Sequence, residues 1–259
     1  MLDRHRKLAV ASVGAAAAAA AVTGIALSSG GGAPRPSAAG KPASPSAVHQ
    51  PGSSSYGPGI TALAAVRQDG LGYTRPGGRG TVTVASSVYG RPSVLPVIAT
   101  RAGWVRVRLP GRPNGSTAWL PASDVSLSGT PYRIVIDLAT THLSLYKYGR
   151  LVFSVPAGVG TPDDPTPTGE FFVQFDELPP EPNPGYGPFI MVTSAHSDVI
   201  SDWEGSGDAL MGIHGPLGED AAIGTTGARI SHGCVRLHLP ALERLADVPP
   251  GTPIDIFQR

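Results

Sequence analysis

The sequence predicts a mainly β protein, and three of its features lead to that prediction. The chain has 259 residues, of which 34 are Gly and 27 are Pro, and such frequent backbone breaks disfavour long helices. Short runs rich in β-branched and aromatic residues alternate with Gly, Pro and Asn-Gly turns. A helical spacing of apolar residues is found near residues 239–246. Together these features favour packed β-sheets with one short helix.

Charge is unevenly distributed along the chain, although the net charge is only +1. Residues 1–60 carry five cations and one anion, residues 61–129 carry eight arginines and two aspartates, and residues 130–259 carry seven cations and sixteen acids. The acidic second half argues against a nucleic-acid-binding protein, which needs a basic surface throughout its binding site. The single Cys excludes an intrachain disulfide and a Cys-rich zinc site.

Residues 1–27 have the pattern of an export segment. Arg4, Arg6 and Lys7 precede an uncharged stretch of 20 residues, 8–27. This stretch is long for a signal peptide and just long enough to span a bilayer, so a cleaved signal peptide and an uncleaved membrane anchor both remain open. A non-targeting Ala-rich tail is the third alternative. Because basic residues before the stretch favour a cytoplasmic N-terminus, both export alternatives predict a location in the cell wall or at the outer face of the cytoplasmic membrane.

Residues 28–60 are expected to form a linker. Ser, Gly, Pro and Ala account for 26 of these 33 residues. Such a composition cannot bury enough apolar surface to fold. A passive leader and a tether for an exported domain need the same composition, so the sequence does not separate them.

Residues 61–129 are expected to form a small basic β module. The predicted strands are Thr81–Val84, Val94–Ala99, Trp104–Leu109 and Ala118–Leu120. In the third strand Val105 and Val107 alternate with arginines, which predicts one buried and one basic face. The stretch 103–121 resembles bacterial SH3-like wall domains, in which a Gly-Trp-Val strand precedes a turn and a second Trp strand. Three roles remain open for this module. It can be a spacer packed on its neighbour, a basic surface for anionic wall polymer, or a partner of complementary charge for the acidic half.

Residues 130–259 are expected to form a second β domain. Its predicted strands are Tyr132–Leu138, His142–Tyr146, Leu151–Val155, Glu170–Phe175, Phe189–Thr193, Ala209–Ile213 and Ile254–Phe257. Residues 176–188 contain five prolines and are expected to form a long loop, a common location for a lid. One helical face is predicted for Leu239, Leu242, Leu245 and Ala246.

The residues best suited to catalysis fall in two short motifs, Ile-His-Gly and Ser-His-Gly-Cys-Val-Arg. A lone Cys is more often an inert buried residue, but His232 and His214 lie two and twenty residues before Cys234. A thiol at neutral pH is only a few per cent thiolate, and a neighbouring imidazole can take its proton and return it to a leaving amine. Gly233 allows close approach of a substrate carbonyl, and the amides around it predict an oxyanion hole.

The order and spacing of these motifs resemble those of L,D-transpeptidase catalytic domains, which act in bacterial cell-wall synthesis. Sixteen residues separate His214 from Ser231. The resemblance extends from the YRIVIDL strand through the TPTGEF turn to the GTPIDI strand, about 125 residues. It implies an L,D-transpeptidase-like β catalytic domain and a Cys–His thiol acyltransferase that needs no metal or organic cofactor.

The resemblance also implies a role for each motif residue. Cys234 is the nucleophile, His214 is the proton acceptor and donor, and the Gly215 carbonyl orients the imidazole. The residues that shape the substrate site are Ser231, His232 and Gly233. For Arg236, a structural ion pair and the binding of a substrate carboxylate both remain open. Outside the motifs, three histidines are expected to be solvated or locally hydrogen-bonded: His142, His196 and His238.

The reaction implied by the resemblance is peptidoglycan L,D-transpeptidation. Cys234 attacks the carbonyl before the terminal D-alanine of a stem tetrapeptide, D-alanine leaves, and an amine of a neighbouring stem resolves the thioester into a cross-link between third residues. With water as the acceptor the same site is an L,D-carboxypeptidase. Carbapenems are expected to acylate the thiol. The expected partners are stem peptides, with the cytoplasmic membrane added if the N-terminus is uncleaved.

Two interpretations from other functional classes remain. A zinc peptidase would use His214, His232 and Cys234 as metal ligands, although the sequence lacks a HExxH-type base. A wall-binding protein with an inactive catalytic fold is the second, and the intact pair of Cys and His argues against it.

Overall fold

The computed structural model describes residues 57–179, 183–203, 205–225 and 227–258. As predicted, this part of the chain is mainly β and contains a short α-helix after the Cys motif, α1 (Leu239–Glu243). The expected export segment and most of the expected linker lie outside the described residues. In the part that is described, no helix is long and apolar enough to cross a bilayer.

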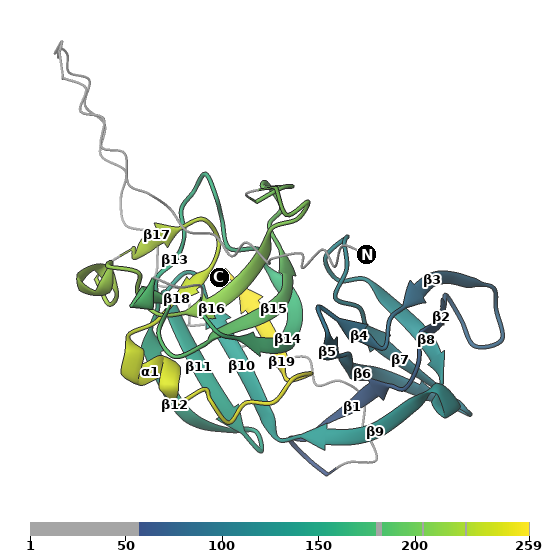
Figure 1. Ribbon diagram of the computed structural model, residues 1–259. Helices are drawn as coiled ribbons and strands as arrows, with labels where there is room; N and C mark the ends of the chain where they lie inside the picture. The colour runs from purple at the N-terminus through teal and green to yellow at the C-terminus, as the bar shows by residue number, and fades with distance from the viewer. Residues whose placement is uncertain (1–56, 180–182, 204, 226, 259) are drawn as a thin grey trace, which may run out of the picture. The chain divides into compact units, whose positions relative to one another are not determined.

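The first module is built on a seven-stranded sheet with the strand order β3-β2-β8-β7-β6-β1-β9 (Figure 1). These strands are β1 (Thr61–Val66), β2 (Gly70–Tyr73), β3 (Gly80–Val84), β6 (Val94–Arg101), β7 (Trp104–Arg108), β8 (Thr117–Pro121) and β9 (Val125–Thr130). A small hairpin of β4 (Ser87–Val88) and β5 (Arg91–Pro92) lies between β3 and β6 in sequence, and a 3-10 turn, Ala122–Asp124, joins β8 to β9. Whether this sheet is SH3-like stays a prediction.

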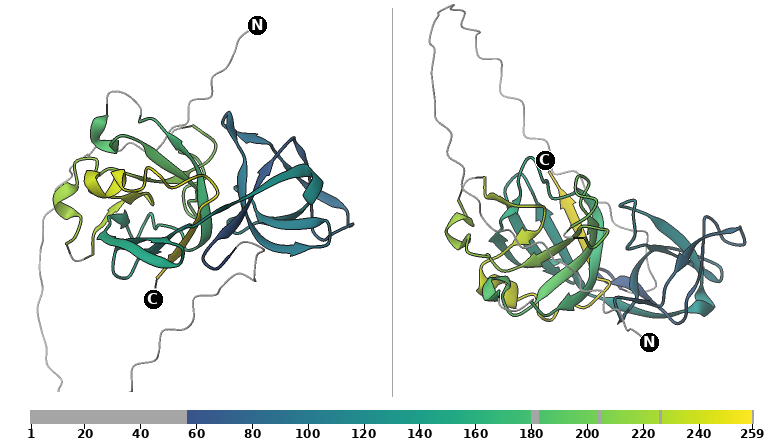
Figure 2. Two further views of the ribbon diagram at one scale, coloured as in Figure 1. Left: turned by 90° about the horizontal axis from the view of Figure 1, so that it is seen from below. Right: turned by 45° about the horizontal axis from the view of Figure 1, so that its top comes forward.

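The second module is built on an eight-stranded sheet with the order β12-β11-β10-β19-β14-β15-β16-β18. Its strands are β10 (Tyr132–Asp137), β11 (His142–Lys147), β12 (Arg150–Pro156), β14 (Gly169–Glu177), β15 (Ile190–His196), β16 (Leu210–His214), β18 (Val235–Arg236) and β19 (Pro253–Phe257). A separate parallel pair consists of β13 (Val159–Gly160) and β17 (Arg229–Ser231). The last strand, β19, is inserted between β10 and β14, as the yellow strand in Figure 2 shows.

The strands predicted from apolar alternation are present. The seven-stranded sheet also contains three strands that were not predicted, because their sequences have no strong β pattern. These are β1, β2 and β9, which are rich in Ala, Gly and Ser and become strands through pairing with their neighbours. The described parts of the Pro-rich segment 176–188 contain regular structure that was not predicted. Strand β14 continues through Glu177, and residues Pro184–Tyr186 form a 3-10 turn capped by Asn183.

Strand β14 is buried on both faces, which explains its near-continuous apolar sequence. Phe171 and Val173 pack in the core of the second sheet. Phe172, on the opposite face, packs with the buried residues of the first sheet, including Leu95 and Val107. The first module is therefore packed on its neighbour through the outer face of β14.

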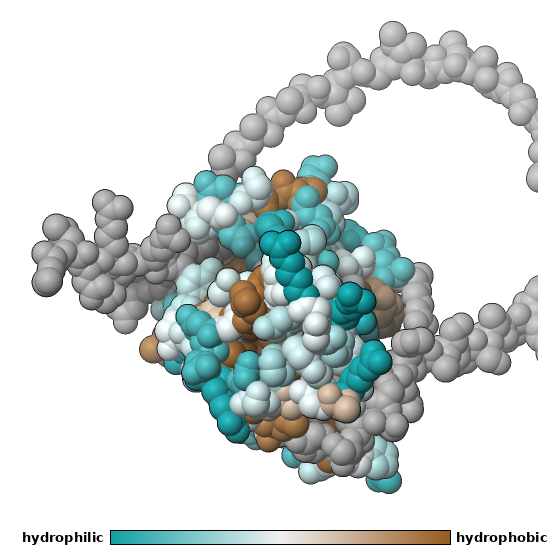
Figure 3. Space-filling model, turned by 90° about the vertical axis from the view of Figure 1, so that its right-hand side faces the viewer, coloured by the Kyte–Doolittle hydropathy of each residue, from teal (hydrophilic) through white to brown (hydrophobic). Residues whose placement is uncertain are grey.

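The arginines of the first module divide into two groups. Arg108 forms an ion pair with Glu170, and Arg112 with Asp208, so complementary charge between the modules accounts for part of the basic excess. Other arginines are exposed: Arg67, Arg75, Arg79, Arg91, Arg101 and Arg106. Figure 3 views the side on which β2, β3 and β8 lie and shows strongly hydrophilic residues among paler and hydrophobic ones. Binding of anionic wall polymer to this surface stays a prediction.

We expect Phe172→Ala to lower the free energy of unfolding by about 3–5 kcal/mol, because the side chain is fully buried where the two cores meet. Leu127→Ala on β9 is the matched control, since Leu127 is 48% exposed and should change stability by less than about 0.5 kcal/mol. Urea denaturation followed by far-UV circular dichroism measures both values. Equal stability of the two variants would show that β14 does not join the cores.

Candidate active site

The parallel pairing of β16 with β18 brings the two catalytic candidates together. In this register Ile213 lies opposite Val235 and His214 lies opposite Arg236. Cys234, one residue before β18, therefore lies beside Gly212, whose amide donates a hydrogen bond of 3.4 Å to Sγ. Since residues 212 and 214 point to the same face of a strand, the imidazole of His214 is on the side of β16 where the thiol lies.

The imidazole of His214 is held in one tautomer. Its Nδ1 lies 2.8 Å from the Gly215 carbonyl oxygen, as the sequence analysis expected. A carbonyl only accepts hydrogen bonds, so Nδ1 carries the proton and Nε2 of the neutral ring has a free lone pair. Tyr186 packs edge-on against the ring at 4.8 Å, and its carbonyl accepts from the Gly215 amide at 2.7 Å. The imidazole is thus oriented as a proton acceptor.

Burial keeps both groups uncharged. Burial and, to a smaller extent, the nearby Arg236 charge lower the pKa of His214 to about 4, although the hydrogen bond to Gly215 acts in the opposite direction. Burial also raises the pKa of the Cys234 thiol above its ordinary value, although the Gly212 amide and the Arg236 charge act in the opposite direction. In the described part of the chain no hydrogen bond joins the two side chains. The resting pair is therefore a neutral thiol and a neutral imidazole.

Ser231 and Gly233 shape the loop before Cys234, and their role in binding substrate stays a prediction. The Ser231 hydroxyl donates to the Cys234 carbonyl at 2.5 Å and accepts from the Gly233 amide at 3.2 Å. Gly233 has a φ of +111°, and a Cβ there would collide with the side chain of Met211. Because the Gly233 amide is already bonded to Ser231, the predicted oxyanion hole would have to use other amides, and it stays a prediction.

His232 lies at the surface of the same site. Its Nε2 is 3.5 Å from Asp164 Oδ2, and the ring of Trp203 packs against it at 5.5 Å. Its Nδ1 is buried without a hydrogen-bond partner among the described residues. His232 is thus placed to contact a ligand and is held by two flanking side chains, one of them on the loop between β15 and β16.

Arg236 is 93% buried, being 7% exposed, and its Nε has no hydrogen-bond partner among the described residues. None of the ion pairs found in the described part of the chain includes it. Burial lowers the pKa of Arg236, but the carboxylate of Glu219 nevertheless acts to raise it, so both roles expected for Arg236 stay predictions. Its charge faces the neighbourhood of Cys234 and His214, because it influences the pKa values of both.

Two further residues position the site and were not identified as site residues from sequence. Thr166 is buried, its hydroxyl donates to the Gly233 carbonyl at 2.8 Å, and it accepts from the Gly160 amide at 2.9 Å. Tyr186 packs behind His214. The only sequence signals were the Thr-Pro-Thr-Gly turn and an aromatic residue between two glycines in a Pro-rich loop. Neither pattern shows which distant residue it contacts.

A metal centre is not indicated. Among the described residues, no group of three or more His, Cys, Asp or Glu side chains is placed to hold a metal ion. His214, His232 and Cys234 accordingly do not form the ligand set that a zinc peptidase needs.

With the geometry established, comparison with known proteins identifies the segment. Residues 131–256 match the family model of the L,D-transpeptidase catalytic domain. This match assigns the segment 131–256, just under half of the chain, to the L,D-transpeptidase catalytic domain family. The transpeptidase domain is 36% identical over 127 residues to YkuD of Bacillus licheniformis and 33% identical to YkuD of Bacillus subtilis, both provisionally named L,D-transpeptidases. Each alignment covers 49% of this chain and 66% of the relative.

Solved L,D-transpeptidase structures also match. The catalytic domain of the Enterococcus faecium enzyme is 26% identical, with 49% of this chain and 96% of that chain covered and a TM-score of 0.35. An enzyme from Mycobacterium smegmatis is 18% identical, with 75% and 99% covered and a TM-score of 0.40. Because these TM-scores are below 0.5, the family assignment rests on the transpeptidase domain model and its sequence relatives.

We expect acidification to destabilise the protein partly through His214. An unfolded imidazole binds a proton near pH 6.5, whereas the buried ring of His214 does so only near pH 4. Between these values the unfolded state holds the extra proton, so stability falls as the pH falls, by about 3 kcal/mol in total. Urea unfolding of wild type and His214→Gln from pH 7 to pH 4 measures this contribution. Identical pH dependence of the two proteins would contradict a buried neutral His214.

Proposed function

We propose that this protein is a peptidoglycan L,D-transpeptidase that works through a thioester on Cys234. The observation that supports this most directly is the orientation of His214. Its Nδ1 is fixed on the Gly215 carbonyl, and its basic Nε2 belongs to the strand whose Gly212 amide contacts the thiol. A thiol paired with an oriented base is suited to acyl transfer.

In the first half-reaction, Sγ of Cys234 attacks the carbonyl carbon between the third stem residue and the terminal D-alanine. Because the thiol is neutral at rest, its proton passes to Nε2 of His214 as the C–S bond forms. The C–N bond then breaks, and the proton moves from His214 to the leaving amine of D-alanine. The product is a thioester between Cys234 and the third residue.

In the second half-reaction, an amine of a neighbouring stem attacks the thioester carbonyl. The C–N bond forms, the C–S bond breaks, and His214 transfers the proton of the amine back to Sγ. The result is a cross-link between third residues. Water as the attacking group gives the alternative L,D-carboxypeptidase reaction with the same residues, and the two differ only in the acceptor.

Arg236 and His232 are proposed to bind the donor stem. A cation that is 93% buried without an ion pair among the described residues is costly unless a ligand neutralises it. A carboxylate of the stem peptide would do so. His232 is two residues before Cys234 and its side chain is 35% exposed, so it is accessible to a donor stem bound at the thiol.

This activity requires export, and the basic residues and uncharged stretch of residues 1–27 support it. We propose that the protein acts in the cell wall or at the outer face of the cytoplasmic membrane. Whether the N-terminus is a cleaved signal or an anchor does not alter the reaction.

Intact-mass analysis of the protein with a disaccharide tetrapeptide tests the mechanism. We expect an adduct lacking D-alanine on wild type and none on Cys234→Ala. His214→Ala should form it about 10²–10⁴ times more slowly, because the thiol loses its proton acceptor. His142→Ala, which removes an imidazole bonded to the Thr140 carbonyl on the far strand β11, is the control. The released product, cross-linked dimer or tripeptide, separates the transpeptidase from the carboxypeptidase.

An adduct on Cys234→Ala would refute the covalent mechanism. Normal rates for His214→Ala together with a large loss in His232→Ala would show that the base is His232. Turnover that is lost with EDTA and restored by zinc would favour the peptidase alternative.

We expect Arg236→Met to raise KM for the tetrapeptide about 10-fold to 100-fold, as for the loss of a charge-assisted hydrogen bond. Two modified donors identify the carboxylate. A C-terminal D-alaninamide tests the terminal carboxylate, and amidation of the third residue's side chain, where it has a carboxyl group, tests the other source. With wild type, KM should be higher for the donor that lacks the carboxylate recognised by Arg236 than for the unmodified donor. With Arg236→Met this difference in KM should disappear. Unchanged KM for Arg236→Met would exclude binding of the carboxylate by this residue.

A further inference from the structure

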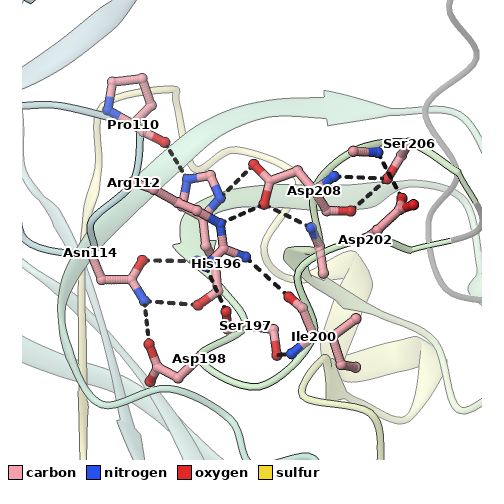
Figure 4. Close-up of polar contacts among 12 residues, drawn as sticks. Pro110, Arg112, Asn114, His196, Ser197, Asp198, Ile200, Asp202, Ser206 and Asp208 are labelled. Carbon is pink, nitrogen blue, oxygen red and sulfur yellow. Dashed lines mark hydrogen bonds and ion pairs between the residues drawn. The ribbon is translucent and has the colours of Figure 1, made fainter.

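The loop between β7 and β8 of the first module is bonded to the transpeptidase domain through Arg112 (Figure 4). The guanidinium donates to Asp208 Oδ1 at 2.9 Å, to the Ser197 carbonyl at 2.8 Å and to the Ile200 carbonyl at 3.1 Å. These three acceptors lie at both ends of the segment 197–209, which joins β15 to β16. One side chain therefore ties the two ends of this segment together.

Asn114, in the same loop, pairs with the last residue of β15. Its Oδ1 accepts from the His196 amide at 3.0 Å, and its Nδ2 donates to the His196 carbonyl at 2.8 Å. Nδ2 also lies 3.1 Å from Asp198 Oδ1. The amide thus bonds both backbone groups of His196, as a neighbouring strand would.

His196 itself differs from the expectation of a solvated or locally bonded histidine. It is 4% exposed, and its partners are distant in sequence. Nε2 lies 2.6 Å from the Pro110 carbonyl, and Nδ1 lies 2.8 Å from Asp208 Oδ2. The ring bridges the β7–β8 loop to the same carboxylate that Arg112 holds, as Figure 4 shows.

Asp208, whose carboxylate contacts Arg112 and His196, connects these residues to the active site through its backbone. Its carbonyl accepts from the Trp203 amide at 3.0 Å, and the Trp203 ring packs on His232, two residues before Cys234. The sequence of this segment carries four acids, Asp198, Asp202, Glu204 and Asp208. Close acids repel one another, so a cation from outside the segment favours the compact arrangement.

We propose that Arg112 and Asn114 of the first module are positioning residues of the active site, which hold the segment 197–209 so that Trp203 packs on His232. The first module then acts on the catalytic centre in addition to packing against its domain. The expected effect of Arg112 and Asn114 on acylation rests on the proposed function. Their expected effect on the structure of segment 197–209 does not.

The test compares the full-length protein with Arg112→Ala, Asn114→Ala and a control, Arg106→Ala. Arg106 is an exposed arginine of the same module, and among the described residues its side chain bonds only to Thr117. Its replacement therefore removes the same charge as Arg112→Ala, but at a position that does not contact the segment. Hydrogen exchange read by mass spectrometry measures the opening of segment 197–209. We expect Arg112→Ala to raise the exchange rate of this segment about 10-fold relative to Arg106→Ala, as for the loss of charge-assisted hydrogen bonds. If Arg112→Ala fails to fold, the exchange rate of the segment in Asn114→Ala is compared with that in Arg106→Ala, because Asn114 holds the segment through separate hydrogen bonds.

Two reactions of the single thiol separate positioning from general damage. We expect Arg112→Ala to slow carbapenem acylation about 10-fold, while alkylation by iodoacetamide, which needs no contact with the segment, changes less than about twofold. In a Trp203→Ala background the effect of Arg112→Ala on acylation should disappear, because both act through one contact.

Exchange and acylation equal to those of Arg106→Ala would overturn the proposal, as would faster exchange with unchanged acylation. A fall in acylation and alkylation by the same factor would also overturn it, since that indicates general damage to the domain. If wild type forms no carbapenem adduct, the proposed function fails, and the exchange comparison still decides whether Arg112 holds the segment.

Discussion

The site depends on the parallel pairing of β16 with β18. These strands are far apart in sequence, and β18 has only two residues. Their register alone decides that Cys234 lies beside Gly212 and on the His214 side of the strand. A shift by one residue would point the thiol to the other face. Neighbouring hydrogen bonds stabilise this register. The backbone of Arg236 pairs with Gly158 on its other side, and the Thr166 hydroxyl donates to the Gly233 carbonyl.

Burial at this pairing determines the chemistry. Cys234 and His214 are both nearly inaccessible, so each is more stable uncharged. A neutral pair makes the thiol less prone to oxidation, because the thiolate is the reactive species. In the proposed mechanism, attack by the thiol must therefore be coupled to proton transfer, and the Gly215 carbonyl and the Tyr186 ring orient the imidazole for it. Among the described residues, Arg236 is the charged group that acts on the pKa values of both.

The sequence predicted the features that have a local signal. Alternation in residues 132–137 and 104–108 predicted strands. The His-Gly and Ser-His-Gly-Cys motifs singled out His214 and Cys234, which the fold brings to neighbouring strands, and the resemblance to the family implied the contact between His214 and the Gly215 carbonyl. Features set by tertiary contact could not be predicted. The Ala- and Gly-rich strands β1 and β2 form through pairing, and His196 is buried because Pro110, Asn114 and Asp208 meet around it. No pattern near residue 196 or residue 112 indicates that the two lie together.

The most direct test of this account is the protonation state of His214 in the resting protein, measured by ¹⁵N NMR of the imidazole at neutral pH. We predict a neutral ring with the proton on Nδ1, and no titration until the pH approaches 4. An imidazolium at neutral pH would show that the resting pair is a thiolate and a cation. A proton on Nε2 would show that the base faces away from Cys234. Either result would contradict the account.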